Sequence, residues 1–201
     1  MNFDTFDEGI MPGGIRSKNE IRVLICYMFN SIKDKLSKDI VIEAVLQYEL
    51  ANYFELSSAF DDLVNNENLI ESGVVDGEVV YILSENGKMI AEQLESTVPY
   101  SVKEKAYTCA LKLLAEKKTK RENKVEITKT ENGYNVNCLI SGGEIELLSF
   151  TIYAPDFEQA EIIKKNFYES PLTVYKVMLA LMTKDKESVG EALEDVYGVI
   201  S

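Results

Sequence analysis

Histidine, the side chain that most often moves protons near neutral pH, does not occur in this 201-residue chain. Its absence excludes Ser-His-Asp and Cys-His nucleophilic sites and removes a principal ligand of protein zinc sites. The sequence also contains no CxxC pair, no GxxxxGK[ST] phosphate loop and no GxGxxG fingerprint. We therefore expect a protein that is not an enzyme, without catalytic residues, a metal site or a cofactor.

Side chains suited to nucleic-acid binding occur in two stretches near the N-terminus. Lysine and arginine neutralise phosphates, whereas hydroxyl and amide groups hydrogen-bond to phosphates and base edges. The candidate phosphate contacts are Arg16, Lys18, Arg22, Lys35, Ser37 and Lys38, and the candidate base contacts are Ser57, Ser58, Asn65 and Asn66. Asp61 and Asp62 lie in the same stretch as the base contacts, and their charges repel phosphate. DNA is therefore an expected partner, but with weak non-specific binding.

The spacing of apolar residues between positions 19 and 95 predicts the elements that carry these side chains: three helices, a β-hairpin and a fourth helix. The hairpin has strands 69–75 and 78–83 around Asp76-Gly77, a sequence that the type I′ turn prefers. This order is typical of a winged helix-turn-helix module, whose third helix enters the major groove of DNA. The side chains expected to face the core are Ile21, Leu24, Ile25, Met28, Phe29 and Ile32, then Val41, Ala44, Val45 and Tyr48, then Leu56, Ala59, Phe60, Leu63 and Val64, and finally Ile90, Ala91 and Leu94.

A cationic helix is predicted from Ser101 to about Arg121. Capping boxes are expected at its start, from Ser101 with Glu104, and at the start of the first helix, from Ser17 with Glu20. The basic side chains of this helix are Lys103, Lys105, Lys112, Lys117, Lys118, Lys120 and Arg121, and all of them except Lys112 are candidate binding residues. Residues 53–98 carry ten carboxylates and one lysine, so the helix could dock on them within the monomer or across a dimer. Alternatively, the basic face contacts an outside partner or is only solvated surface.

The charge changes sign near Ser96 to Pro99, where a proline among small polar residues indicates a domain boundary. We therefore predict a winged-helix domain at 1–98, with a core closed without residues beyond Pro99, and a second domain at 99–201. Alternation predicts a three-stranded antiparallel meander with turns at Asn132-Gly133 and Gly142-Gly143, followed by helices at about 155–168, 171–182 and 188–197. A change of parity between Leu147 and Leu148 indicates a β-bulge, or a strand covered on both faces. The expected fold class is α+β.

Four stretches are specific enough for comparison with known families: "FDEGIMPGGIRSKNEIRVLICYMF", "LANYFE", "SVKEKAYTCALKLLA" and "ENKVEI". In these stretches the chain resembles an uncharacterised bacterial family, domain-of-unknown-function family 4364. The resemblance extends over nearly the whole chain, and it implies an N-terminal winged helix of the kind found in transcriptional regulators. The family has no established activity, so the resemblance implies no catalytic residue and no cofactor.

We interpret the sequence as that of a transcriptional regulator with a winged helix and a C-terminal domain for dimerisation or sensing, and we expect a homodimer. One alternative is a protein-interaction module that binds a basic partner through its acidic third helix and wing. Another is a small-molecule sensor with a pocket between the meander and helices 157–168 and 171–182. Its candidate lining residues are Tyr134, Tyr153, Tyr168 and Tyr175, for which packing in an aromatic core is the alternative role. A net charge of −13 and the lack of a long apolar run favour a cytoplasmic protein that does not bind membranes. Three widely spaced cysteines, Cys26, Cys109 and Cys138, are expected to be free, buried thiols.

Overall fold

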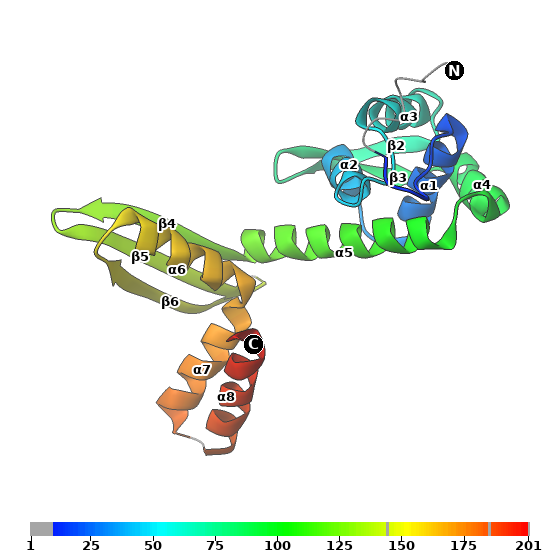
Figure 1. Ribbon diagram of the computed structural model, residues 1–201. Helices are drawn as coiled ribbons and strands as arrows, with labels where there is room; N and C mark the ends of the chain where they lie inside the picture. Colours follow the sequence, from blue (N-terminus) through cyan, green and yellow to red (C-terminus); the bar gives the residue numbers. More distant parts are fainter. Residues whose placement is uncertain (1–9, 144, 185, 201) are drawn as a thin grey trace. The chain divides into compact units, whose positions relative to one another are not determined.

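The computed structural model describes residues 10–143, 145–184 and 186–200 (Figure 1). The chain divides into two compact units, with the division between Glu116 and Lys117. The first unit contains α1 (Lys18–Ser31), β1 (Leu36–Ser37), α2 (Lys38–Leu46), α3 (Tyr53–Asn65), β2 (Leu69–Val75), β3 (Glu78–Leu83), α4 (Glu85–Leu94) and the 3-10 helix η1 (Glu95–Thr97). Helix α5 (Tyr100–Glu122) crosses the division, and the second unit continues with β4 (Asn123–Thr130), β5 (Gly133–Gly142), β6 (Ile145–Ala154), α6 (Phe157–Glu169), α7 (Pro171–Thr183) and α8 (Lys186–Ile200). The protein is therefore mixed α+β, as predicted.

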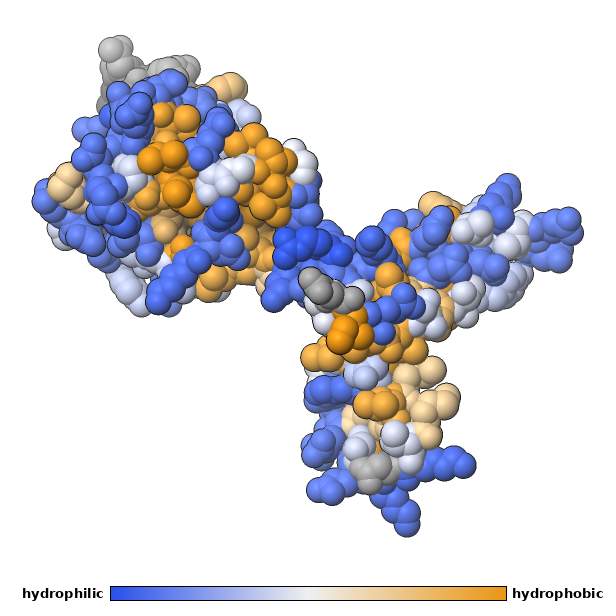
Figure 2. All heavy atoms as spheres, turned by 180° about the vertical axis from the view of Figure 1, so that it is seen from behind, coloured by the Kyte–Doolittle hydropathy of each residue, from blue (hydrophilic) through white to orange (hydrophobic). Residues whose placement is uncertain are grey.

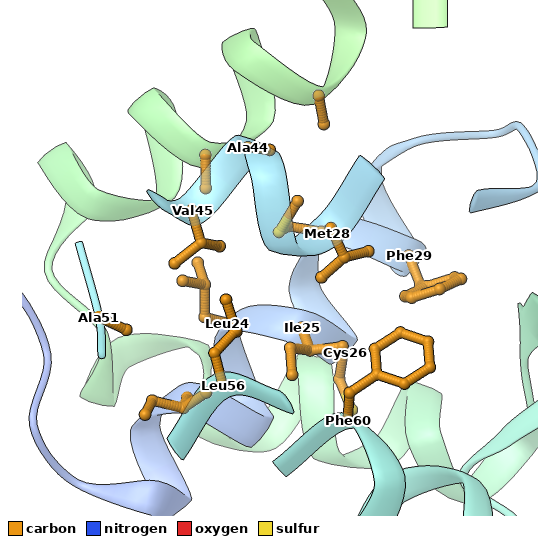
Figure 3. Close-up of a cluster of buried hydrophobic side chains, with 14 of the residues drawn as sticks. Leu24, Ile25, Cys26, Met28, Phe29, Ala44, Val45, Ala51, Leu56 and Phe60 are labelled. Atoms are coloured by element: carbon orange, nitrogen blue, oxygen red, sulfur yellow. The ribbon is translucent and has the colours of Figure 1, made fainter. Parts of the chain in front are cut away.

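Helix α1 is the centre of the first core (Figure 3). All six side chains of its predicted apolar stripe are buried, and Val23 and Cys26 are buried as well. Burial on this much of its surface requires neighbours on several sides, which α3, α4 and β3 provide. Ser17 occupies the N-cap position, but its side chain makes no capping hydrogen bond, so the predicted capping box does not form.

Helices α2 and α3 follow the predicted pattern, and each is capped by a side chain. The Ser37 hydroxyl accepts a hydrogen bond from the backbone N–H of Ile40, and the Asn52 side-chain oxygen accepts one from that of Phe54. Every predicted inward residue of α3 is buried except Val64, which is partly buried against the core. The prediction for Tyr48 is wrong: α2 ends at Leu46, so this side chain lies beyond the helix and is 41% exposed.

The predicted hairpin forms with the predicted bounds, β2 and β3. Asp76 and Gly77 have φ angles of 52° and 82°, the two positive values that a type I′ turn requires. A short strand that the sequence did not indicate, β1, pairs antiparallel with β3, so the sheet order is β1-β3-β2. The ring of Tyr81 on β3 lies edge-on to that of Phe60, with the centroids 5.2 Å apart, and this contact joins the sheet to α3.

Gly87 fixes the place where the hairpin returns to helix α4. The Ser84 hydroxyl accepts a hydrogen bond from the Gly87 N–H, and the Ser84 N–H donates to the carbonyl oxygen of Asn68. A Cβ atom added at Gly87 would lie 2.5 Å from that same carbonyl oxygen and 2.5 Å from the side chain of Leu83. The backbone is therefore too close for any side chain. Leu94, at the end of α4, is 45% exposed, so the prediction that it faces the core is wrong.

The first half of α5 belongs to the first core. Val102, Ala106, Cys109 and Ala110 are buried there, so the expectation that this core closes without residues beyond Pro99 is wrong. The helix also begins one residue before Ser101, because the carbonyl oxygen of Pro99 already accepts hydrogen bonds from the next turn. Ser101 is therefore inside the helix and cannot act as its N-cap.

The second unit is built on the predicted antiparallel meander, in the order β4-β5-β6. Its first turn is centred on Glu131 and Asn132, one residue earlier than predicted, because Gly133 already pairs with Thr130. In β6 the pairing passes from Leu148 to Glu146, which leaves Leu147 as the extra residue of a bulge. The change of parity therefore did mark a β-bulge.

Helix α6 packs against all three strands, and α7 turns from the sheet to pair with α8 (Figure 1). The Asp156 carboxylate caps α6 by accepting a hydrogen bond from the N–H of Gln159 at 2.7 Å. Lys176 of α7 and Asp195 of α8 form an ion pair at 2.7 Å, which raises the pKa of Lys176 through the hydrogen bond. Ala180 is the only residue of α7 that is fully buried, although most of this helix is apolar.

The three cysteines are free and buried, as predicted. Burial raises the pKa of the Cys26 thiol to about 12 and that of the Cys138 thiol to about 11. Both thiols are therefore protonated near neutral pH and act as packing groups.

Candidate nucleic-acid interface and ligand pocket

The outward side of α3 carries aromatic, hydroxyl and acidic side chains. Phe54, in its first turn, is 74% exposed, and its ring lies edge-to-face with that of Tyr53 at a centroid distance of 5.5 Å. Asp61 and Asn65 are exposed farther along the helix, and the two candidate base contacts between these ends, Ser57 and Ser58, are half-buried. Asn66 is exposed after the helix, where its amide donates to the carbonyl oxygen of Asp62.

Two of the predicted phosphate-binding cations lie against α3 from the side of α1. Lys18 Nζ is 2.7 Å from a carboxylate oxygen of Asp62, and Arg22 donates to the same oxygen. The hydrogen bond from Lys18, followed by that from Arg22, lowers the pKa of Asp62. The carboxylate is thus fully ionised near neutral pH and is paired with both cations.

A third cation approaches α3 from the side of α2. Lys38 Nζ is 2.6 Å from a carboxylate oxygen of Asp61, and it also lies 5.7 Å from the centre of the Phe60 ring. The structure therefore brings Lys18, Arg22 and Lys38 to the two flanks of α3, an arrangement that their sequence positions did not reveal. It also pairs all three with the acidic residues of that helix.

The remaining predicted phosphate contacts differ in accessibility. Lys35 is exposed, and its ammonium donates to the backbone carbonyl of Ser72 in the hairpin at 3.2 Å. Arg16 is exposed just before α1. Ser37 is only 3% exposed and its hydroxyl caps α2, so it is not a surface group. The hairpin itself, residues 69–83, contains no lysine or arginine to add to this set.

The predicted basic helix divides into two parts with different surroundings. Lys103 is 7% exposed; its ammonium lies 2.7 Å from a carboxylate oxygen of Glu95 and 5.3 Å from the centre of the Tyr27 ring. Lys105 lies over the ring of Tyr48 at 5.8 Å. These two lysines therefore take part in the packing of the first unit. Of the others, Lys118 is 3.9 Å from Glu122, Lys120 and Arg121 are exposed, and Lys117 is half-buried.

A pocket of about 500 Å³ opens in the second unit between the β5–β6 face, α6 and α7. Its apolar lining consists of Cys138, Phe150, Ile152, Ile163, Phe167 and Val174. One alternative interpretation of the sequence placed a pocket here, but none of its four candidate tyrosines is among the lining residues. The Tyr168 hydroxyl instead accepts from the backbone N–H of Val125, and the Tyr153 hydroxyl donates to the carbonyl oxygen of Asn132.

In residues 10–143, 145–184 and 186–200, none of the helices combines the length and the apolar character that a membrane span needs. That part of the chain also contains no group of three His, Cys, Asp or Glu residues placed to hold a metal ion. A family model described as "Domain of unknown function (DUF4364)" matches residues 21–182. No curated protein and no solved structure matches the chain.

Proposed function

We propose, from the premise that the chain belongs to the DUF4364 family, that it is a transcriptional regulator with an N-terminal winged helix. The element order α1, β1, α2, α3, β2, β3 and the β1-β3-β2 sheet support the winged helix. In such a module α3 enters the major groove of DNA and the β2–β3 hairpin is the wing. The second unit would then serve dimerisation or sensing, and the protein would act in the cytoplasm.

The observation that carries this proposal is the position of three cations beside α3. Lys18 and Arg22 flank it from α1, and Lys38 flanks it from the start of α2. A helix in the major groove has phosphate backbones on both of its sides, so cations on both flanks are suited to contact them. Ser57, Ser58 and Asn65 would then approach the base edges.

DNA binding on this surface requires an exchange of partners. In the free protein Asp62 forms ion pairs with Lys18 and Arg22, and Asp61 forms an ion pair with Lys38. Phosphates would have to replace these carboxylates, and the three cations with two carboxylates leave a net charge of only +1. We therefore expect weak binding to non-specific DNA, and we expect that most of the affinity for a specific site comes from base contacts.

The substitution Asp62→Asn tests the proposal directly. It frees two cations, so we expect tighter binding to any duplex and a plot of log affinity against log salt that is steeper by up to about 2 units. Glu92→Gln is the matched control, because it removes one negative charge from the exposed face of α4. Gel retardation and fluorescence anisotropy over a salt series measure both quantities. If Asp62→Asn and wild type both fail to retard duplex DNA at low salt, the DNA-binding role is wrong.

The exposed aromatic side chains at the start of α3 favour a second candidate, a protein-interaction module. Exposed aromatic residues are typical centres of protein interfaces, and the carboxylates on α3 favour a basic partner. We therefore expect the substitution Phe54→Ala to weaken binding of a labelled amphipathic Lys-Leu peptide, measured by fluorescence anisotropy. A peptide that binds wild type and Phe54→Ala equally would remove this candidate.

Apolar surface on the α7–α8 hairpin supports dimerisation through the second unit. Leu172, Leu181 and Met182 are 59%, 55% and 72% exposed, and Leu193 and Tyr197 of α8 are also exposed. Figure 2 shows apolar side chains along the surface of this hairpin. A second copy of the chain carries the same surface, so a symmetric pairing would cover both. A dimeric winged helix would in turn contact two DNA half-sites.

A further inference from the structure

The pocket of the second unit exists because α6 and α7 diverge. Helix α6 lies on the sheet, but α7 packs mainly on α8 and contacts the sheet chiefly at β5. Ser170 joins the two helices in a conformation that is neither helical nor extended, with φ −153° and ψ 59°. Part of the β5–β6 face therefore has no helix over it, and an opening of about 500 Å³ remains there. This volume falls in the range of about 300 to 1,000 Å³ that is usual for small-molecule sites.

The walls of the pocket are apolar, and its polar lining includes one acidic side chain, Glu169. Phe150 and Phe167 form one wall with their rings edge-to-face at 6.1 Å, and Phe167 is 4% exposed. The polar lining residues are Asn166, Glu169 and Ser170, at the end of α6. Among the described residues, no lysine or arginine lines the pocket. With the residues that the structure describes, the side chains of Asn166 and Glu169 form no ion pair or hydrogen bond. Both side chains are therefore available to a ligand.

We propose that this pocket binds a small molecule with an aromatic or aliphatic body and a cationic amino group, for which Glu169 is the counter-ion. The inference rests on the sensing role in the proposed function and names the class of molecule that would be sensed. The apolar walls bury the body, the Glu169 carboxylate attracts the ammonium group, and the Asn166 amide oxygen can accept a second hydrogen bond. A carboxylate or phosphate ligand would meet the negative charge of Glu169, and none of the described lining residues is a lysine or arginine.

Indole derivatives test this proposal on the full-length chain, because the protein has no tryptophan and gives no indole fluorescence of its own. Tryptamine carries an amino group, and indole-3-propionate carries a carboxylate on a similar body. We expect the fluorescence anisotropy of tryptamine to rise to saturation as protein is added, with an affinity at least about tenfold above that of indole-3-propionate.

Three variants identify the site. Glu169→Gln is expected to weaken tryptamine binding about threefold to fivefold, the range of an exposed ion pair. Glu169→Lys is expected to reverse the preference in favour of indole-3-propionate. Val174→Phe fills the pocket and should weaken the binding of both probes, provided that its thermal melt stays cooperative. Glu158→Gln, which removes an exposed charge at the other end of α6, is the matched control and should bind like wild type.

Equal binding of the two indoles would overturn the proposal, as would tryptamine binding that Glu169→Gln leaves unchanged. Light scattering measures the particle mass in the same titrations. If the probes bind only to the extent that this mass increases, the opening is an interface between copies instead. The regulator proposal is tested separately by DNA retardation. Tryptamine binding without DNA binding would support the pocket proposal and contradict the regulator proposal. DNA binding without tryptamine binding would support the regulator proposal and contradict the pocket proposal.

Discussion

Helices α1 and α7 are both rich in apolar residues, yet the chain buries one and leaves much of the other exposed. α1 lies between α3, α4 and β3 and places seven of its side chains in the first core. α7 has α8, α6 and β5 as its neighbours, and only Ala180 is fully buried. A helix that is apolar on every side is normally covered on every side. The first unit thus buries its apolar helix α1 in its core, while the second leaves most of the apolar helix α7 incompletely buried.

The strongest test of the first core is truncation. A chain that ends at residue 98 lacks Val102, Ala106, Cys109 and Ala110, which the first core buries. From the area lost, we expect it to be less stable than a fragment ending at residue 122 by about 4 to 6 kcal/mol, enough to prevent cooperative folding. Urea unfolding followed by circular dichroism measures the difference. Equal stability of the two fragments would mean that α5 is not part of this core.

Next in size is the effect of a cavity in the first core. Phe60 is 1% exposed and contacts the rings of Phe29 and Tyr81, so we expect Phe60→Ala to cost about 3 to 5 kcal/mol of unfolding free energy. Phe54→Ala is the matched control on the same helix, and at an exposed site it should change stability by less than about 0.5 kcal/mol. Equal effects of the two substitutions would contradict the assigned inward face of α3.

In the second unit the corresponding test is a charge on the apolar surface of α7. We expect Leu181→Glu to weaken self-association by about 2 to 3 kcal/mol, because dimerisation would bury an unpaired carboxylate. The melting temperature of the monomer should stay the same, since Leu181 is already 55% exposed. Light scattering over a concentration series measures the association. Lys165→Glu, on the exposed side of α6, is the control. A wild-type chain that remains monomeric at all concentrations would exclude the dimer.

The smallest expected effects are on two exposed ion pairs, which respond to opposite ends of the pH scale. Asp62 has a pKa below the ordinary 3.8, so its contribution is present above that value and is lost as the pH falls through the lowered pKa. Lys176 has a pKa above the ordinary 10.5, so its contribution is present below that value and is lost as the pH rises through the raised pKa.

Asp62→Asn should therefore differ from wild type in stability near neutral pH and converge with it in acid, whereas Lys176→Met should converge with wild type in strong alkali. Chemical unfolding at three pH values measures both differences. A gap between Asp62→Asn and wild type that persists unchanged below the lowered pKa would show that its effect does not arise from the ion pair. Likewise, a stability difference between Lys176→Met and wild type that persists unchanged above the raised pKa would show that its effect does not arise from the ion pair.

Much of the fold could be predicted because its signals are local. The Asp76-Gly77 turn and the parity change at Leu147 each lie within a few residues of the feature that they specify. Strand β1 has two residues, too few to display a period, and it depends on pairing with β3. Tyr48 and Leu94 were misplaced for a related reason, because helix periodicity does not indicate where the helix ends.

The candidate sites could be predicted only in part, because their geometry joins distant positions. The sequence identified both the cations and the carboxylates, but Arg22 and Asp62 are 40 positions apart and Lys38 and Asp61 are 23 apart. Residue type alone does not determine such pairs. One alternative interpretation, based on the order of the meander and its helices, placed a pocket where the opening lies. Its lining was not predicted, since which ring faces the opening depends on how α7 leaves the sheet.

The close approach at Gly87 has a consequence for how this chain can diverge. In a library of all single substitutions, selected for folded protein, position 87 should accept almost no other residue, because the Asn68 carbonyl and the Leu83 side chain occupy the space. At Gly77, in the hairpin turn, an added Cβ would meet nothing within 4 Å, and only its φ of +82° restricts the choice. Variation in hairpin length and sequence should therefore accumulate at the tip, while the angle at which the hairpin leaves the helices is inherited unchanged.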